Sequence, residues 1–240
     1  MVTPETLLAL GLIAVYLFDS MHFLCIGELV VVTRGGELHG ISFGLGFELG
    51  GRRPFLPNPL TPFWPELRAE WVDVPGNEAD VQTAAGEMRQ RAATLGALGI
   101  LSTACTACIV IGAPAALLVG YQLVFIGCVL LCVACALVAA IVLLLRRRAL
   151  ELKWGQCLSL ALVAIVCLPC AGNLARAVAK ARSWKLPAYQ VAQIPLTGAN
   201  ATQLREQLCE ALLRARRYVD EASVEYDRLS EQLRLLEEGP

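Results

Sequence analysis

The chain has 240 residues, of which 56% are apolar and only 17% are charged, and its mean hydropathy is +0.58. A soluble domain usually has about 45–50% apolar and roughly 25% charged residues. The composition therefore excludes a soluble enzyme, a secreted disulfide scaffold and a disordered chain, and the net charge of −1 excludes a general basic surface for nucleic acid. The excess of apolar residues favours a multi-pass membrane protein. Arginine far outnumbers lysine, as in proteins of GC-rich bacteria, so we expect this membrane to be a bacterial inner membrane.

Residues 1–27 are expected to form a first transmembrane helix. The apolar stretch that begins at Leu7 is long enough to cross a bilayer only if it includes Asp19 and His22. Ionisable residues inside a span cost about 2.5–3.5 kcal/mol each, so this intramembrane polar pair is a candidate proton relay or ligand site. The alternative is that the span ends near Phe18 and that both polar side chains lie at the lipid headgroups.

Residues 28–77 are expected to form a small β-rich module that contains many prolines and glycines. Apolar and polar or glycine residues alternate from Ile41 to Leu49, which predicts a half-buried strand, and Gly35-Gly36 supplies a turn before it. The proline-rich segment from Pro54 to Pro65 predicts an extended loop, because proline lacks a backbone donor. Another short strand is expected at 67–74.

Residues 78–175 are expected to contain three further transmembrane helices. The chain carries no Asp, Glu, Lys, Arg or His from Ala92 to Leu145. A straight helix of that length would be roughly 80 Å long, more than twice the ~30 Å hydrocarbon core, so the chain must fold back near Gly120. The spans then lie at about 95–118, 122–145 and 154–175, and the predicted fold is an all-α polytopic membrane protein with about four transmembrane helices.

The distribution of lysine and arginine predicts the orientation in the membrane. Both the segment after the first span and the 146–155 loop are rich in these residues, whereas the turn at 120 has none. Since cytoplasmic loops are enriched in Lys and Arg, we expect the β-rich module inside and both termini in the periplasm. The basic interfacial linker at 176–199 is the exception to this pattern.

Residues 200–240 are expected to form one amphipathic or coiled-coil helix. Its apolar positions between 204 and 236 step by three and four residues, with one additional four-residue step. The same pattern suits self-association, binding to a protein partner, or packing on the rest of this chain.

Cysteine is the most unusual residue of the predicted spans, where three pairs have the spacing Cys-x-x-Cys. A helix places residues i and i+3 on one face, so each pair can present two sulfurs to one site. The pairs Cys105–Cys108 and Cys132–Cys135 could hold a soft metal such as Cu(I), whereas Cys167–Cys170 could exchange disulfides. The structural alternative is that these thiols act as small apolar residues between packed helices.

The expected four-span architecture with a membrane Cys-Leu-Pro-Cys motif is similar to the quinone-linked membrane thiol oxidoreductases that recharge periplasmic oxidants. The resemblance covers only this architecture and one short motif, and it implies a redox role for Cys167 and Cys170. That family also has a second reactive cysteine pair in an outer loop, and the turn at 120 contains no cysteine.

These patterns favour a non-enzymatic membrane subunit or adaptor without a cofactor. Its expected partners are the lipid bilayer and a protein bound through the C-terminal helix and the β-rich module, with no nucleic acid. A membrane thiol–disulfide oxidoreductase and a small carrier coupled to metal or protons are the alternatives.

Overall fold

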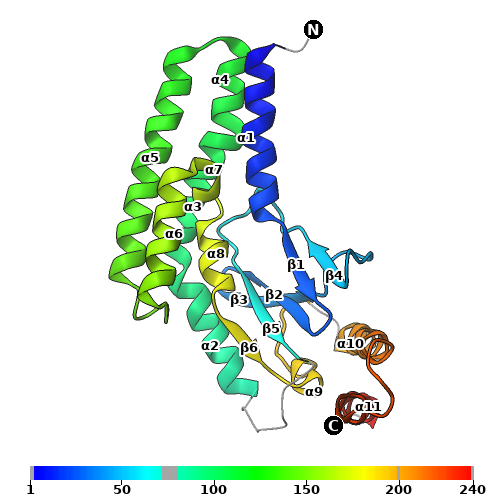
Figure 1. Ribbon diagram of the computed structural model, residues 1–240. Coiled ribbons are helices and arrows are strands. Elements are labelled where there is room, and N and C mark those ends of the chain that lie inside the picture. Colours follow the sequence, from blue (N-terminus) through cyan, green and yellow to red (C-terminus); the bar gives the residue numbers. More distant parts are fainter. Residues whose placement is uncertain (1–2, 72–80, 199–200, 239–240) are drawn as a thin grey trace. The chain divides into compact units, whose positions relative to one another are not determined.

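The computed structural model describes residues 3–71, 81–198 and 201–238, and Figure 1 shows its secondary structure. The chain divides into two compact units. The helical unit comprises Met1–His22, Leu56–Pro65 and Ala93–Ala181, and the mixed unit comprises Phe23–Phe55, Glu66–Ala92 and Arg182–Pro240. Each unit is thus assembled from three separate segments of the chain.

The predicted all-α, four-span fold is wrong. About 61% of the structure is helical and 13% is strand, and the strands form two sheets. Within the described residues, two helical stretches are long and apolar enough to cross a membrane, Gly96–Val119 and Gln122–Leu145. At about 1.5 Å per residue, 24 residues span roughly 36 Å, which exceeds the hydrocarbon thickness. The other two predicted spans, in 1–27 and at 154–175, form helices of only 17 and 13 residues.

The helical unit is built around these two long stretches. The first consists of α3 (Gly96–Thr106), the π-helical turn η1 (Ala107–Gly112) and α4 (Ala113–Val119), and the second is α5 (Gln122–Leu145). The chain reverses at Gly120, whose φ of 81° is accessible to glycine at little cost. The π-helical turn lies directly before Pro114, which has no N–H for the helical ladder.

The first predicted span is the shorter helix α1 (Pro4–Ser20), which packs against α4 within the helical unit. Thr3 caps it by accepting a hydrogen bond from the Thr6 N–H. The chain leaves the helix at Met21 and enters strand β1 (His22–Cys25). With 17 residues, α1 measures roughly 25 Å, shorter than the hydrocarbon core.

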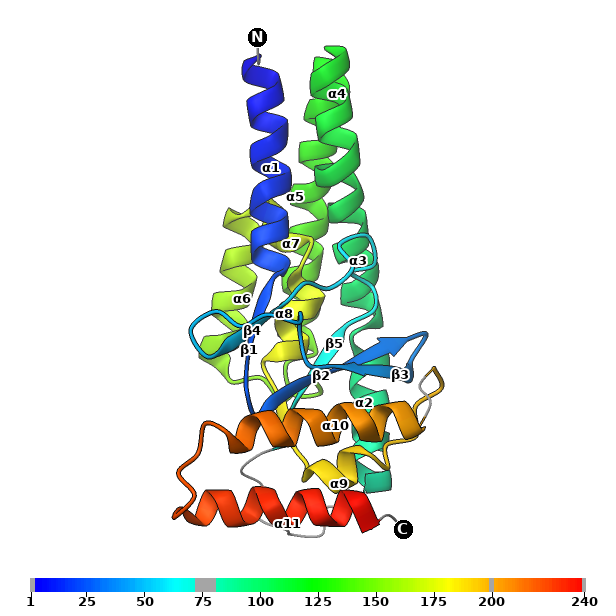
Figure 2. The same cartoon turned by 90° about the vertical axis from the view of Figure 1, so that its right-hand side faces the viewer.

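The predicted span at 154–175 is a reversal rather than one helix. Helix α6 (Trp154–Val166) ends at Cys167, whose backbone is extended. Two short helices follow, α7 (Leu168–Ala171) and α8 (Leu174–Lys180), and α8 returns alongside α6 (Figures 1 and 2). Pro169 accounts for the break, because its ring would clash with the carbonyl four residues earlier in a continued helix.

The main sheet of the mixed unit has four strands in the order β3-β2-β5-β6. Its central strand β2 (Glu28–Arg34) pairs antiparallel with β3 (Glu37–Ser42) and with β5 (Glu66–Glu70). Gly35 and Gly36, with φ of 61° and 87°, form the two-residue turn between β2 and β3. Leu29, Val30 and Val31 are buried, as expected for a central strand that is covered on both faces.

The predicted strand at 41–49 ends early. Strand β3 stops at Ser42, and the apolar residues that continue the alternation lie in a loop that reaches β4 (Arg52–Phe55). Gly44 has a φ of 89°, which interrupts the extended backbone, and β4 pairs with β1 in a separate two-stranded sheet. The predicted strand at 67–74 is β5, and the end of that prediction, 72–74, lies outside the described residues.

The C-terminal region forms two helices instead of the single predicted one. Helix α10 (Ala201–Arg216) and helix α11 (Val224–Glu238) pack against each other (Figure 2). The apolar stripe is largely buried within the mixed unit, at Leu204, Leu208, Ala211, Leu212, Ala215, Leu229 and Leu236. The remaining helices of this unit are α2 (Val81–Thr94) and the short α9 (Ala188–Val191).

Strand β6 (Ser183–Lys185) overturns the predicted separation of the β-rich module from the C-terminal tail. It pairs in parallel with β5, with Arg68 opposite Ser183 and Glu70 opposite Lys185. A hydrogen-bonded sheet cannot have neighbouring strands on opposite sides of a bilayer. The module and the tail therefore lie on the same side of any membrane that the chain crosses.

Candidate functional site

Cys167 and Cys170 are joined by a disulfide at the reversal between α6 and α8. Their Cα atoms are 5.2 Å apart, and both residues are half-buried. The break that Pro169 introduces brings the two sulfurs together, since Cys167 is the last residue before α7 and Cys170 lies within it. Thiol–disulfide exchange is the chemistry that this pair can perform.

The other two Cys-x-x-Cys pairs lie on neighbouring helices of the helical unit. Cys105 of α3 and Cys132 of α5 are buried, and each thiol lies near the backbone carbonyl of the other residue, at 3.8 and 3.5 Å. Cys108 and Cys135 are half-buried. These reciprocal contacts are those of small side chains between packed helices.

A metal centre needs several ligands that converge on one point. Among residues 3–71, 81–198 and 201–238, no group of three or more His, Cys, Asp or Glu side chains is placed to hold a metal ion. The structure thus brings Cys105 and Cys132 together, with Cys135 close to Cys105 and Cys108 close to Cys132, but it does not place the four thiols to hold a metal ion.

The predicted intramembrane polar pair lies at the junction of two elements. Asp19 lies in the last turn of α1, whereas His22 begins strand β1 and is buried. Nearby, α1 makes a different polar contact, in which the Asn173 amide donates a 3.0 Å hydrogen bond to the Tyr16 carbonyl. The polar centre of the helical unit is therefore formed around Asn173.

Arg176 belongs to this polar centre, and like Asn173 it was not predicted as a site residue from the sequence. It is fully buried, and its Nη1 donates to the Asn173 Oδ1 at 3.1 Å, while its Nη2 donates to the Asn58 carbonyl at 2.5 Å. The Tyr16 hydroxyl donates to the next carbonyl, that of Pro59. These bonds attach the proline-rich loop to the helices. The i, i+3 spacing of Asn173 and Arg176 after an apolar run was the available signal.

The loop between β3 and β4 is fixed within the mixed unit by a group of polar contacts. The Arg53 guanidinium donates to the Glu48 carboxylate at 3.0 and 2.7 Å, and the Tyr218 hydroxyl donates to the same carboxylate at 3.0 Å. The hydrogen bond from Arg53, followed by that from Tyr218, lowers the pKa of Glu48 and keeps it ionised near neutral pH. We call Glu48, Arg53 and Tyr218 the loop clamp.

The loop that the clamp holds exposes three large apolar side chains. Leu45, Phe47 and Leu49 are 44%, 54% and 56% exposed, and we call them the apolar tip. The backbone is tight at Gly44, where a Cβ would lie 2.9 Å from the Arg53 Cβ and 3.0 Å from the Pro54 carbonyl. Apolar residues displayed on a loop fixed in this way are typical of a binding surface.

No protein-family model, curated protein or solved structure matches the chain. The candidate sites are therefore the three that the geometry itself supplies: the Cys167–Cys170 disulfide, the polar centre at Arg176 and the apolar tip. Of these, Arg176 contributes hydrogen bonds inside the helical unit, whereas the other two present groups toward the surface.

Proposed function

We propose that the chain is a membrane-embedded, non-enzymatic adaptor that binds a protein partner through the apolar tip of its mixed unit. The observation that supports this proposal is the exposure of Leu45, Phe47 and Leu49 on one clamped loop. Burying such a side chain in an interface contributes about 1.5–3 kcal/mol. Because the clamp fixes the loop before binding, less conformational entropy is lost when the partner binds.

The C-terminal helices have a different role in this proposal. The stripe at 204–236 was expected to bind a partner, but its main apolar residues are already buried within the mixed unit. Tyr218, which follows α10, instead supports the loop by its hydrogen bond to Glu48. The C-terminal region thus supports the binding surface and is not itself the proposed contact.

The membrane anchor in this proposal is the helical hairpin formed by Gly96–Val119 and Gln122–Leu145. Two crossings return the chain to the side from which it started, as the pairing of β5 with β6 requires. Arg89 and Arg91 precede the hairpin and Arg146-Arg147-Arg148 follows it, whereas its turn has no basic residue. The positive-inside rule then places the mixed unit in the cytoplasm of a bacterial inner membrane.

Site-specific photo-crosslinking from position 47 tests the adaptor function. With a photoreactive phenylalanine analogue in place of Phe47 in cells of the source organism, we expect one discrete protein adduct. Leu49→Ser should weaken it, because apolar contact is removed, and Glu48→Gln should weaken it through the clamp. The same analogue at Leu213, which is 40% exposed on α10, is the control.

The crosslinking pattern can also contradict the proposal. Adducts from position 47 that equal those from position 213, or that persist unchanged in Leu49→Ser, would show that the tip is not a specific contact. Adducts to lipid alone would show that the tip contacts the membrane surface rather than a protein.

The proposed orientation predicts the labelling of Cys25, which is exposed on β1. In intact bacterial cells, a membrane-impermeant maleimide should leave Cys25 unmodified, and a permeant maleimide should then label it. Peptide mass analysis locates the label, and Cys25→Ser is the control. Labelling of Cys25 by the impermeant reagent would place the mixed unit outside the cell and contradict the proposed orientation.

A second candidate function is thiol–disulfide exchange, which the Cys167–Cys170 disulfide favours. A thiolate of a dithiol protein would attack one sulfur, form a mixed disulfide and break the Cys167–Cys170 bond. The second thiol of that protein would then attack the mixed disulfide. This step forms a disulfide within the substrate protein and leaves Cys167 and Cys170 reduced. The substrate protein loses two electrons and two protons in this exchange, and the chain gains them.

Alkylation before and after reduction tests this second function. The peptide with Cys167 and Cys170 should be unmodified in the isolated protein and should gain two alkyl groups after treatment with a dithiol. Cys167→Ser should trap a mixed disulfide between Cys170 and a substrate protein in cells. A pair that is already reduced in freshly lysed cells, and that traps no adduct, would exclude this function.

A further inference from the structure

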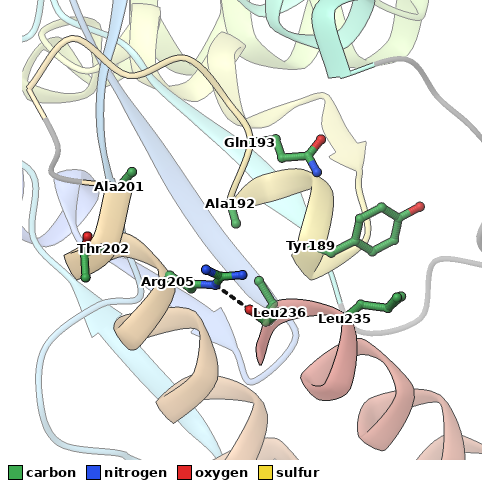
Figure 3. Close-up of a pocket in the computed structure, with 8 residues that line it drawn as sticks. All are labelled: Tyr189, Ala192, Gln193, Ala201, Thr202, Arg205, Leu235 and Leu236. Atoms are coloured by element: carbon green, nitrogen blue, oxygen red, sulfur yellow. Dashed lines mark hydrogen bonds between the residues drawn. The ribbon is translucent and has the colours of Figure 1, made fainter. Parts of the chain in front are cut away.

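The mixed unit contains a cavity of about 450 Å³ between α9, α10 and α11, which Figure 3 shows. Small-molecule sites in proteins usually enclose about 300–1,000 Å³ and combine apolar walls with a few polar groups. The cavity meets both conditions, since leucine and alanine side chains line it together with Arg205 and Gln193. It lies among residues that neither the apolar tip nor the loop clamp uses.

Arg205 is the only cation among the residues that line this cavity in the described part of the chain. It extends from α10, and its Nε donates a hydrogen bond to the Leu236 carbonyl in α11. Figure 3 shows that this bond fixes the guanidinium at the cavity wall, with its terminal nitrogens on the side of Ala192. A guanidinium anchored through Nε keeps its two terminal nitrogens available for a bidentate partner.

The other lining residues supply an apolar surface and one amide. Leu235 and Leu236 contribute from α11, and Ala192 contributes from the end of α9. Gln193 adds a side-chain amide, which can donate and accept hydrogen bonds. Such a cavity suits a molecule with an apolar body and a charged end, because a bare inorganic anion would leave the leucine wall uncovered.

We propose that this cavity binds a small carboxylate with an apolar body, with the carboxylate on the Arg205 guanidinium. Arginine and carboxylate form two parallel hydrogen bonds, a geometry that lysine cannot reproduce. The apolar body lies against Leu235 and Leu236, and Gln193 contacts a further polar group of the ligand. The carboxylate belongs either to a free organic acid or to the C-terminus of a peptide.

Fluorine NMR on the full-length protein in lipid nanodiscs tests this inference. The probe is 3-(4-fluorophenyl)propanoate, and its primary amide is the matched uncharged ligand. We expect the acid to bind with a Kd of order 1 mM, as is typical of a fragment of this size, and the amide to bind at least fivefold more weakly. An N-acetylated dipeptide that ends in leucine distinguishes the two sources of the carboxylate. The dipeptide should displace the probe if the cavity binds peptide C-termini, and should not displace it if the cavity binds only free organic acids.

Two variants assign the binding to the cavity. Arg205→Gln should weaken binding of the acid at least tenfold and leave binding of the amide unchanged. Arg217 is exposed and directly follows α10, and Arg217→Gln should change neither affinity. Since Arg205→Gln also removes the contact with Leu236, a comparison of acid with amide on the unmodified protein provides an independent test. Equal binding of acid and amide there, or no acid binding at ~10 mM, would overturn the proposal.

Discussion

Arg176→Ala should lower the midpoint of thermal unfolding by about 6–12 °C, which corresponds to a loss of about 3 kcal/mol for a chain of this size. The fully buried guanidinium donates to the Asn173 amide oxygen and to the Asn58 carbonyl. Alanine would leave the buried Asn173 amide oxygen and the Asn58 carbonyl without those donors and would leave a cavity in place of the side chain. The measurement is thermal unfolding of the full-length protein in nanodiscs.

Two further variants separate this effect from a general loss of positive charge. Arg176→Lys keeps the charge but loses the planar guanidinium that donates to both acceptors. Its unfolding midpoint should therefore lie between those of Arg176→Ala and the unmodified protein. Arg148→Ala removes an exposed arginine and should shift the midpoint by no more than about 2 °C. If Arg176→Ala behaves like Arg148→Ala, the polar centre does not stabilise the helical unit.

Gly172→Val should destabilise the protein by about 2–3 kcal/mol. Gly172 follows α7, and a Cβ there would lie 2.8 Å from the Thr106 hydroxyl and 3.0 Å from the Tyr16 ring. Its φ is −62°, so the cost arises from packing and not from backbone strain. The expected signature is a lower unfolding midpoint with unchanged helix content by circular dichroism at low temperature.

The matched substitution is Gly127→Val in α5, where no atom beyond the adjoining residues and backbone of its own helix lies within 4 Å of the position that a Cβ would occupy. Valine has a somewhat higher helix propensity than glycine, so this variant should be neutral or slightly stabilising. Equal destabilisation by the two substitutions would mean that the backbone at Gly172 does not pack closely against Thr106 and Tyr16.

The local turns of the fold were predictable from the sequence because glycine determines them. Gly35-Gly36 forms the β2–β3 turn and Gly120 reverses the long hairpin, and each adopts a positive φ that other residues rarely accept. The alternation from Phe43 to Leu49 gave a wrong prediction of a continued strand, and a glycine is again the cause. Gly44 also has a positive φ, so the apolar residues continue their period in sequence while the backbone has left the strand.

The long-range features were not predictable from hydropathy. The segment 154–175 is apolar enough for a span, yet Pro169 reverses it, and the buried Arg176 looks like an ordinary flanking charge in sequence. Strand β6 has only three residues, too few for a periodic signal, and its partner β5 is remote in the chain. Of the candidate site residues, the Cys167–Cys170 pair could be identified by spacing, whereas the loop clamp needed Tyr218 from a distant segment.

The pairing of β5 with β6 also imposes an order on biosynthesis. Arg68 leaves the ribosome more than a hundred residues before its partner Ser183, and both long apolar helices are synthesised in between. Until β6 arrives, β5 is an edge strand with open hydrogen-bonding groups, which other nascent chains can pair with. Synthesis of the two long apolar helices thus precedes closure of the sheet, and a chain interrupted before residue 183 retains an aggregation-prone edge.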